Sequence, residues 1–133
     1  MNLFDNTLRD GGNVVGHGFS RELTLSIVGG LLKAGIKDIE LGNCKGLGAY
    51  ELNGADKACT DEEYLDMLQP YLPQGRIGMF LLASNGAKAP VEMAAERGLN
   101  FLRVGANATD GAGSVSTVER VKKIGIVGRY TGY

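Results

Sequence analysis

Residues 76–82, RIGMFLL, are the strongest indication of the fold, because this run is short and almost wholly apolar. A run of this kind is typical of a parallel strand that is buried on both faces. Weaker strand patterns stand at residues 3–8 (LFDNTL), 36–41 (IKDIEL) and 99–104 (LNFLRV). Residues 124–129 (IGIVGR) predict the opening of a fifth strand.

Helical patterns alternate with these strands. Ser20 is placed to cap a first helix, which Gly35 ends as a left-handed C-terminal residue would. The predicted apolar face of this helix consists of Leu23, Ile27, Val28, Leu31 and Leu32. The capping box TDEE at residues 60–63 predicts the start of a second helix. A third helix is predicted at 90–97, with Gly98 at its end, and a short fourth at 116–123.

This alternation predicts an α/β protein with a parallel sheet and right-handed crossovers. A complete (β/α)8 TIM barrel needs about 250 residues. We therefore expect residues 1–133 to form the first four βα units, the N-terminal half of a TIM-barrel catalytic domain. A flavodoxin-like open sheet of five strands fits the same length and remains the alternative.

Composition excludes several function classes. The chain has 14 basic and 15 acidic residues and a net charge of −1, so no excess of positive charge favours nucleic acid or an acidic membrane surface. No apolar window is long enough to span a bilayer, and the N-terminus lacks a signal-peptide pattern. A cytoplasmic protein is expected. Cys44 and Cys59 fit neither a zinc spacing nor a disulfide framework, so free thiols are expected.

Polar residues near the ends of the predicted strands are the candidates for chemistry, since parallel barrels collect their active sites there. They are Arg9, Asp10, Glu40, Asn43 and Arg103. A carboxylate at such a position binds a hard divalent cation. An adjacent guanidinium holds a carboxylate or an enolate oxygen. A buried structural pair between Arg9 and Asp10 is the alternative interpretation.

The run DNTLRDGGN at residues 5–13 resembles the opening motif of the 4-hydroxy-2-oxovalerate aldolases. Their relatives include HMG-CoA lyases and the isopropylmalate and homocitrate synthases. The similarity extends to most of residues 3–110. Its further matches are HGFS at 17–20, AGI at 34–36, IELGN at 39–43, GLG at 46–48, TDEE at 60–63 and LRV at 102–104.

The resemblance implies a metal-dependent TIM-barrel lyase that cleaves a 4-hydroxy-2-oxo acid to pyruvate and an aldehyde. It implies that Asp10 is a ligand of Mn2+ or Mg2+ and that Arg9 stabilises the pyruvate enolate. Glu40 matches an acidic residue near the family's site, and we expect it to bind substrate together with Arg9, Asn43 and Arg103. The implied partners are a small 2-oxo acid, further copies of the chain, and an aldehyde dehydrogenase.

Two departures from the family pattern limit this expectation. Asn13 stands where the aldolases have the histidine proposed as their base, and His17 is the candidate substitute. The family completes its metal site with a His-x-His pair from a late strand, whereas this chain contains one histidine. We therefore expect the chain alone to be inactive. A Claisen-type acyl-CoA synthase and a non-catalytic half barrel that self-associates remain the alternatives.

Overall fold

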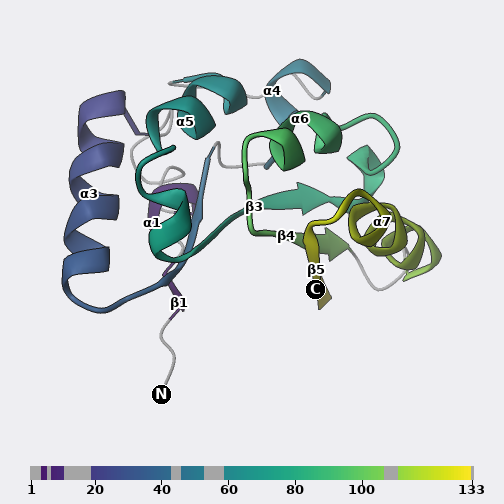
Figure 1. The fold of residues 1–133 in the computed structure, drawn as a ribbon. Helices are drawn as coiled ribbons and strands as arrows, with labels where there is room; N and C mark the ends of the chain where they lie inside the picture. The colour runs from purple at the N-terminus through teal and green to yellow at the C-terminus, as the bar shows by residue number, and fades with distance from the viewer. Residues whose placement is uncertain are drawn as a thin grey trace.

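The computed structural model describes residues 4–5, 7–10, 19–42, 46–52, 59–106 and 111–132. For residues 9–10, 106, 111–113 and 130–132 it describes the backbone only. The elements are β1 (Phe4–Asp5), α1 (Thr7–Asp10), α3 (Arg21–Lys33), β2 (Asp38–Leu41), α4 (Ala49–Leu52), α5 (Asp61–Met67), η1 (Leu72–Gln74), β3 (Arg76–Leu82), η2 (Ala83–Asn85), α6 (Val91–Glu96), β4 (Phe101–Ala106), α7 (Gly111–Ile124) and β5 (Val127–Gly132) (Figure 1).

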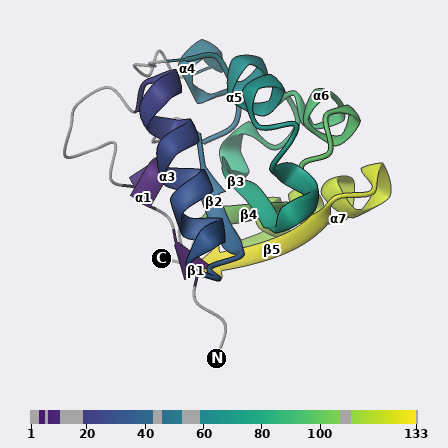
Figure 2. The same cartoon turned by 60° about the vertical axis from the view of Figure 1, so that its left-hand side comes forward.

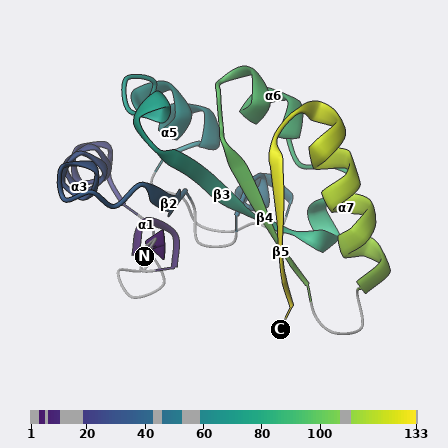
Figure 3. The same ribbon diagram turned by 60° about the horizontal axis from the view of Figure 1, so that its bottom comes forward.

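The strands form one parallel sheet in the order β1-β2-β3-β4-β5. The helices α3, α5, α6 and α7 lie on the same side of this curved sheet (Figures 2 and 3). Sequential parallel order with one helical layer is how consecutive βα units are arranged in a barrel wall. A flavodoxin-like sheet has the order 2-1-3-4-5 instead, so the flavodoxin alternative is wrong. The parallel α/β prediction is confirmed.

The two faces of the sheet carry different side chains, because successive residues of a strand point to opposite sides. Ile39, Ile77 and Leu102 lie on the helix-facing side, where they join Val28 of α3 and Leu65 of α5 in the hydrophobic core. The other side of the sheet, which we call the inner face, carries a mixed set of charged and aromatic side chains. Its described members include the charged and aromatic residues Phe4, Asp38, Glu40, Arg76, Phe80, Phe101, Arg103 and Arg129, and the apolar residues Leu82 and Val127.

The caps and stops predicted for two helices are present. Ser20 Oγ accepts a hydrogen bond from the amide of Leu23 at 3.3 Å. Thr60 Oγ1 accepts one from the amide of Glu63 at 3.1 Å. Gly35 has a φ of 86°, a left-handed conformation that glycine adopts without steric cost. These signals confirm the starts of α3 and α5 and the end of α3.

The first strand is shorter than predicted. β1 ends at Asp5, and Thr7–Asp10 forms a helical turn where the strand prediction continued to residue 8. Asp5 explains the difference, because its carboxylate accepts hydrogen bonds from the Thr7 amide at 3.0 Å and from the Thr7 hydroxyl at 3.3 Å. Such side-chain bonds to the backbone two residues onward end a strand and begin a turn.

Two helix predictions also need correction. Leu23 was expected on the buried face of α3 but is 46% exposed, because that face is centred on Thr24 and Val28. The last helix, α7, begins at Gly111 rather than near residue 116. Buried Ser114 and Thr117 belong to this helix, so packing outweighs the weak helix propensity of its glycines. No helix in the described ranges is both long and apolar enough to cross a membrane.

Candidate functional site

The turn that carries Arg9 and Asp10 lies against the second strand. α1 follows β1 directly and contacts β2, with which β1 pairs in parallel. The backbone of Arg9 and Asp10 is therefore beside the strand that carries Glu40, at the carboxyl end of β1. The directions of the Arg9 and Asp10 side chains are not described, and Asn13, His17 and Asn43 lie outside the described residues.

Glu40 and Arg103 are the predicted site residues whose side chains the structure describes, and it brings them together. Arg103 Nε donates to Glu40 Oε2 at 2.7 Å, and its Nη2 donates to Glu40 Oε1 at 2.8 Å. This bidentate pair spans β3, since Glu40 is on β2 and Arg103 on β4. The Glu40 side chain is 0% exposed and that of Arg103 is 17% exposed. The pair is thus a desolvated, charge-assisted contact.

Aromatic rings surround the guanidinium of this pair. The Arg103 Cζ atom lies 5.1 Å from the centroid of the Phe80 ring and 5.7 Å from that of Phe4. Both distances are within the range of cation–π attraction. Gly78 lies on β3 between the two charged strands, and any side chain there would collide with the Phe101 ring. Because Gly78 has no side chain, the inner face has room at this position for the Phe101 ring.

The geometry changes what Arg103 can do chemically. Its Nε and Nη2 atoms already hold Glu40, so a substrate carboxylate would have to approach the other edge of the guanidinium, between Nη1 and Nη2. Glu40 is likewise held by a cation, which balances its charge without any metal ion. The arrangement is suited to orienting Glu40 as a fixed anion at the inner face beside the α1 turn.

A second charged cluster on the inner face was not anticipated from the sequence. Asp38 accepts two hydrogen bonds from Arg76, at 2.7 Å each, and a longer one from Arg129 at 3.4 Å. The hydrogen bonds from Arg76 are the main reason that the pKa of Asp38 lies below its ordinary value. The sequence feature that could have predicted this cluster is the two-residue spacing of Asp38 and Glu40, which puts both side chains on the same face of the strand.

The described residues do not by themselves form a metal site. No three of their His, Cys, Asp or Glu side chains converge on one point. Asp38 and Glu40, the acids of the inner face, are each paired with arginine. The single histidine of the sequence is His17, outside the described residues. Of the metal ligands that the resemblance implies, the sequence contains Asp10 but no His-x-His pair.

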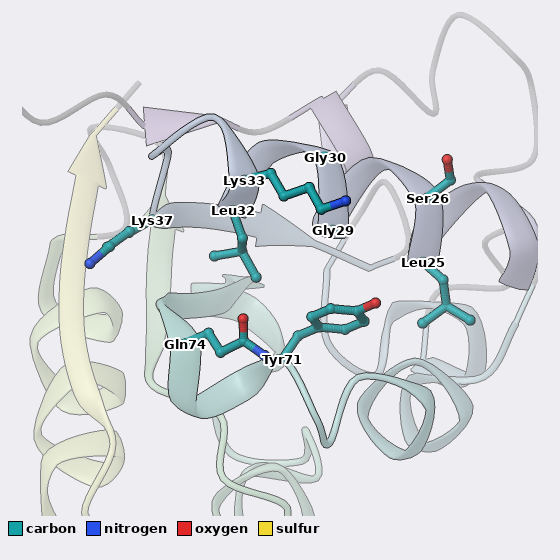
Figure 4. Close-up of a pocket in the computed structure, with 9 residues that line it drawn as sticks. All are labelled: Leu25, Ser26, Gly29, Gly30, Leu32, Lys33, Lys37, Tyr71 and Gln74. Atoms are coloured by element: carbon teal, nitrogen blue, oxygen red, sulfur yellow. The ribbon is translucent and has the colours of Figure 1, made fainter.

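A cleft of about 650 Å³ lies away from the predicted site, between α3 and the segment before β3. Figure 4 shows Tyr71 below Gly29 and Gly30 of α3, with Lys33 and Lys37 nearby. Lys37 directly precedes β2, so the cleft is beside the amino-terminal end of that strand. Neither Glu40 nor Arg103, the predicted site residues with described side chains, lines it.

Comparison with known proteins supports the sequence resemblance. The chain is 33% identical over 126 residues to a 4-hydroxy-2-oxovalerate aldolase of Carboxydothermus hydrogenoformans, which covers 95% of this chain and 38% of the relative. It is 32% identical over 127 residues to the aldolase of Moorella thermoacetica, covering 96% of this chain and 38% of that protein. A 4-hydroxy-2-oxovalerate aldolase of Pseudomonas putida is 32% identical, over 93% of this chain and 36% of its own length.

These matches confirm that the chain resembles the 4-hydroxy-2-oxovalerate aldolases. No protein-family model matches the chain. The chain spans a little over a third of the length of the curated relatives it matches.

Proposed function

We propose that this chain is the first part of the catalytic barrel of a carbon–carbon lyase that releases pyruvate from a 4-hydroxy-2-oxo acid. The observation that carries the proposal is the position of the Arg9-Asp10 turn, directly after β1 and in contact with β2. Catalytic groups of βα barrels stand at that end of the strands. The similarity to the 4-hydroxy-2-oxovalerate aldolases, at 32–34% identity, supports the same chemistry.

Each residue has a stated role in this proposal. Arg9 holds the 2-oxo acid through its carboxylate or enolate oxygen, because a guanidinium matches two oxygens at once. A fixed positive charge there lowers the energy of the enolate that forms when the carbon–carbon bond breaks. Glu40, held by Arg103, keeps the charge around Arg9 in a constant arrangement. Asn13, His17 and Asn43 line the loops over the substrate, and His17 is the candidate proton acceptor.

We further propose that the complete protein uses Mn2+ or Mg2+, with Asp10 as one ligand. The metal would supply Lewis-acid polarisation of the 2-oxo group. No three His, Cys, Asp or Glu side chains of the described residues come together, so a complete site requires ligands in addition to these residues. For this reason the chain alone is expected to bind Mn2+ weakly.

The half barrel that self-associates is a second candidate, favoured by two exposed apolar side chains at the edges of the sheet. Phe4 is 42% exposed and Val127 is 52% exposed, and both belong to the outermost strands of the sheet. Unpaired outer strands promote pairing with another chain. This second candidate requires a stable dimer of the isolated chain, and a monomer by sedimentation velocity would rule it out. The Claisen-type synthase has no comparable support among the described residues.

The proposal is tested by assaying pyruvate release from 4-hydroxy-2-oxovalerate. The isolated chain should release none, and a protein that contains this chain together with a downstream His-x-His pair should release it. In that protein Asp10→Ala should lose activity through weaker Mn2+ binding. Arg9→Ala should keep Mn2+ affinity and lose turnover. Unchanged turnover in either variant would remove that residue from the proposed site.

A further inference from the structure

The cleft beside α3 has the size of a small-molecule site. Its volume of about 650 Å³ lies within the range of ordinary ligand pockets, roughly 300–1,000 Å³. One wall is α3, and the other is Tyr71 together with Gln74 of η1 (Figure 4). Both walls belong to consecutive βα units, whereas further strands of a barrel would join the sheet at its edges, β1 and β5. Completion of a barrel at those edges would therefore not fill this cleft.

The charge of the cleft is opposite in sign to that of the chain. Lys33 and Lys37 line it, and none of its nine lining residues is acidic, although the whole chain has a net charge of −1. Neither lysine forms an ion pair with another residue of the described ranges. Figure 4 shows the Lys33 ammonium group beside Gly29 and Gly30, with Lys37 at the other end of the cleft. The cleft thus offers two cations to a ligand that arrives from solvent.

Apolar and hydroxyl groups complete the lining. Leu25, Leu32 and the Tyr71 ring provide an apolar surface. The hydroxyls of Ser26 and Tyr71 make no hydrogen bond with another residue in the described part of the chain, so both can donate to a ligand. A largely apolar lining with a few polar groups that fix orientation is typical of small-molecule sites.

Two consecutive glycines leave the backbone of α3 accessible at the cleft. Gly29 and Gly30 lie in the interior of a 13-residue helix, where glycine is less favourable than alanine. A Cβ atom at Gly29 would lie 3.5 Å from the Tyr71 hydroxyl oxygen, which is an ordinary contact, and one at Gly30 would have no described neighbour within 4 Å outside its own helix. Packing of the described residues therefore does not require a glycine at position 30. Close approach of a ligand to the backbone is another use of glycine.

We propose that this cleft binds a small organic anion, whose carboxylate or phosphate group is held by Lys33 and Lys37 and whose apolar part lies on Leu32 and Tyr71. A lysine ammonium is a compact charge on a long flexible stem, so both lysines can turn toward an anion that enters the cleft. Gly30 gives the ligand access to the surface of α3.

The position of the cleft separates this ligand from the substrate of the proposed lyase. Lys37 directly precedes β2, so the cleft is at the amino-terminal end of that strand, whereas the Arg9-Asp10 turn follows the carboxyl end of β1. The organic anion is therefore a second ligand, in addition to the 2-oxo acid.

Nuclear magnetic resonance titration of the 15N-labelled 133-residue chain tests the proposal. Phenyl phosphate and benzoate are the probes, since each joins an aromatic ring to one of the two anionic groups. The amides of Gly30, Lys33 and Tyr71 should shift together and saturate with one dissociation constant, on the order of 1 mM. The tighter probe identifies the anionic group as phosphate or carboxylate. Benzyl alcohol, which has no charge, and inorganic phosphate, which has no apolar part, should each bind several-fold more weakly.

Two variants test the cation and the shape of the cleft separately. Lys33→Gln should weaken binding of the tighter probe about two- to fivefold, because an exposed ionic contact is lost. Lys122→Gln is the matched control and should leave the affinity unchanged, since Lys122 is also an exposed lysine in the last turn of a helix but does not line the cleft. Gly30→Leu places a side chain in the cleft and should abolish the saturable shifts, while circular dichroism shows that the helices are retained.

Four results would each overturn the proposal. They are the absence of saturable shifts with both anionic probes, an equal effect of Lys33→Gln and Lys122→Gln, undiminished binding by Gly30→Leu, and an affinity for benzyl alcohol or inorganic phosphate equal to that of the anionic probes. These readouts need no pyruvate release, so they are independent of the proposed lyase function.

Discussion

The buried pair between Arg103 and Glu40 gives the sharpest test of the inner face. Arg103→Met keeps most of the side-chain length but removes both donors from Glu40, whose oxygens lie 2.7 and 2.8 Å from the guanidinium. Glu40 is fully buried, so the variant takes the bidentate cation away from a carboxylate that is shielded from water. Breaking a buried ion pair in this way costs about 3–5 kcal/mol. That is a large share of the roughly 5–15 kcal/mol of stability of an ordinary domain.

The assay is urea unfolding followed by circular dichroism at pH 7, with the free energy of unfolding taken from the midpoint and slope. Arg97→Met is the matched control, because Arg97 pairs with the exposed acids Glu62 and Asp66. Exposed pairs contribute about 0–1 kcal/mol. The double variant Glu40→Leu/Arg103→Met should lose less than the sum of the two single variants, because it removes both charges of the pair together. A loss for Arg103→Met no larger than that of Arg97→Met would refute the reasoning.

Three further predictions concern stability. The pKa of Asp38 in the folded protein lies below its ordinary value of 3.8, so Asp38 stabilises the fold above pH 3.8 and loses this contribution as the pH falls through the folded pKa. The urea midpoint of Asp38→Asn should therefore fall less on acidification than the midpoint of the unchanged protein. Thr24 has a buried hydroxyl without a hydrogen-bond partner among the described residues, so Thr24→Val should leave the melting temperature unchanged or raise it. Gly78→Ala should destabilise by about 1–3 kcal/mol through collision with Phe101, whereas Gly30→Ala, in open space on α3, should stabilise by up to about 1 kcal/mol in the same melts.

Local signals made much of the fold predictable from the sequence. The bounds of β3 agree with the apolar run at residues 76–82, because a buried parallel strand needs no partner-specific pattern. The caps at Ser20 and Thr60 and the glycine stop at Gly35 depend on neighbouring residues alone. The helical turn at Thr7–Asp10 was missed because the acceptor role of Asp5 competes with the strand pattern.

The charged inner face was less predictable. The Glu40–Arg103 contact joins residues 63 positions apart, and it depends on the register of three strands. Both residues were predicted as polar groups near strand ends, but the local sequence around each gave no indication that they would pair. The cluster of Asp38 with Arg76 and Arg129 was missed for the same reason, since it unites β2, β3 and β5.

The central claim, that Asp10 is the metal ligand of a lyase site at the end of β1, is tested most directly by Mn2+ titration of the 15N-labelled chain. Paramagnetic broadening should appear first at the amides around Asp10, including Thr7 and Leu8, and should vanish in Asp10→Ala. The affinity should be weak, because one carboxylate leaves most coordination to water. Broadening that persists in Asp10→Ala, or that appears first at the exposed acids of α5, would contradict the account.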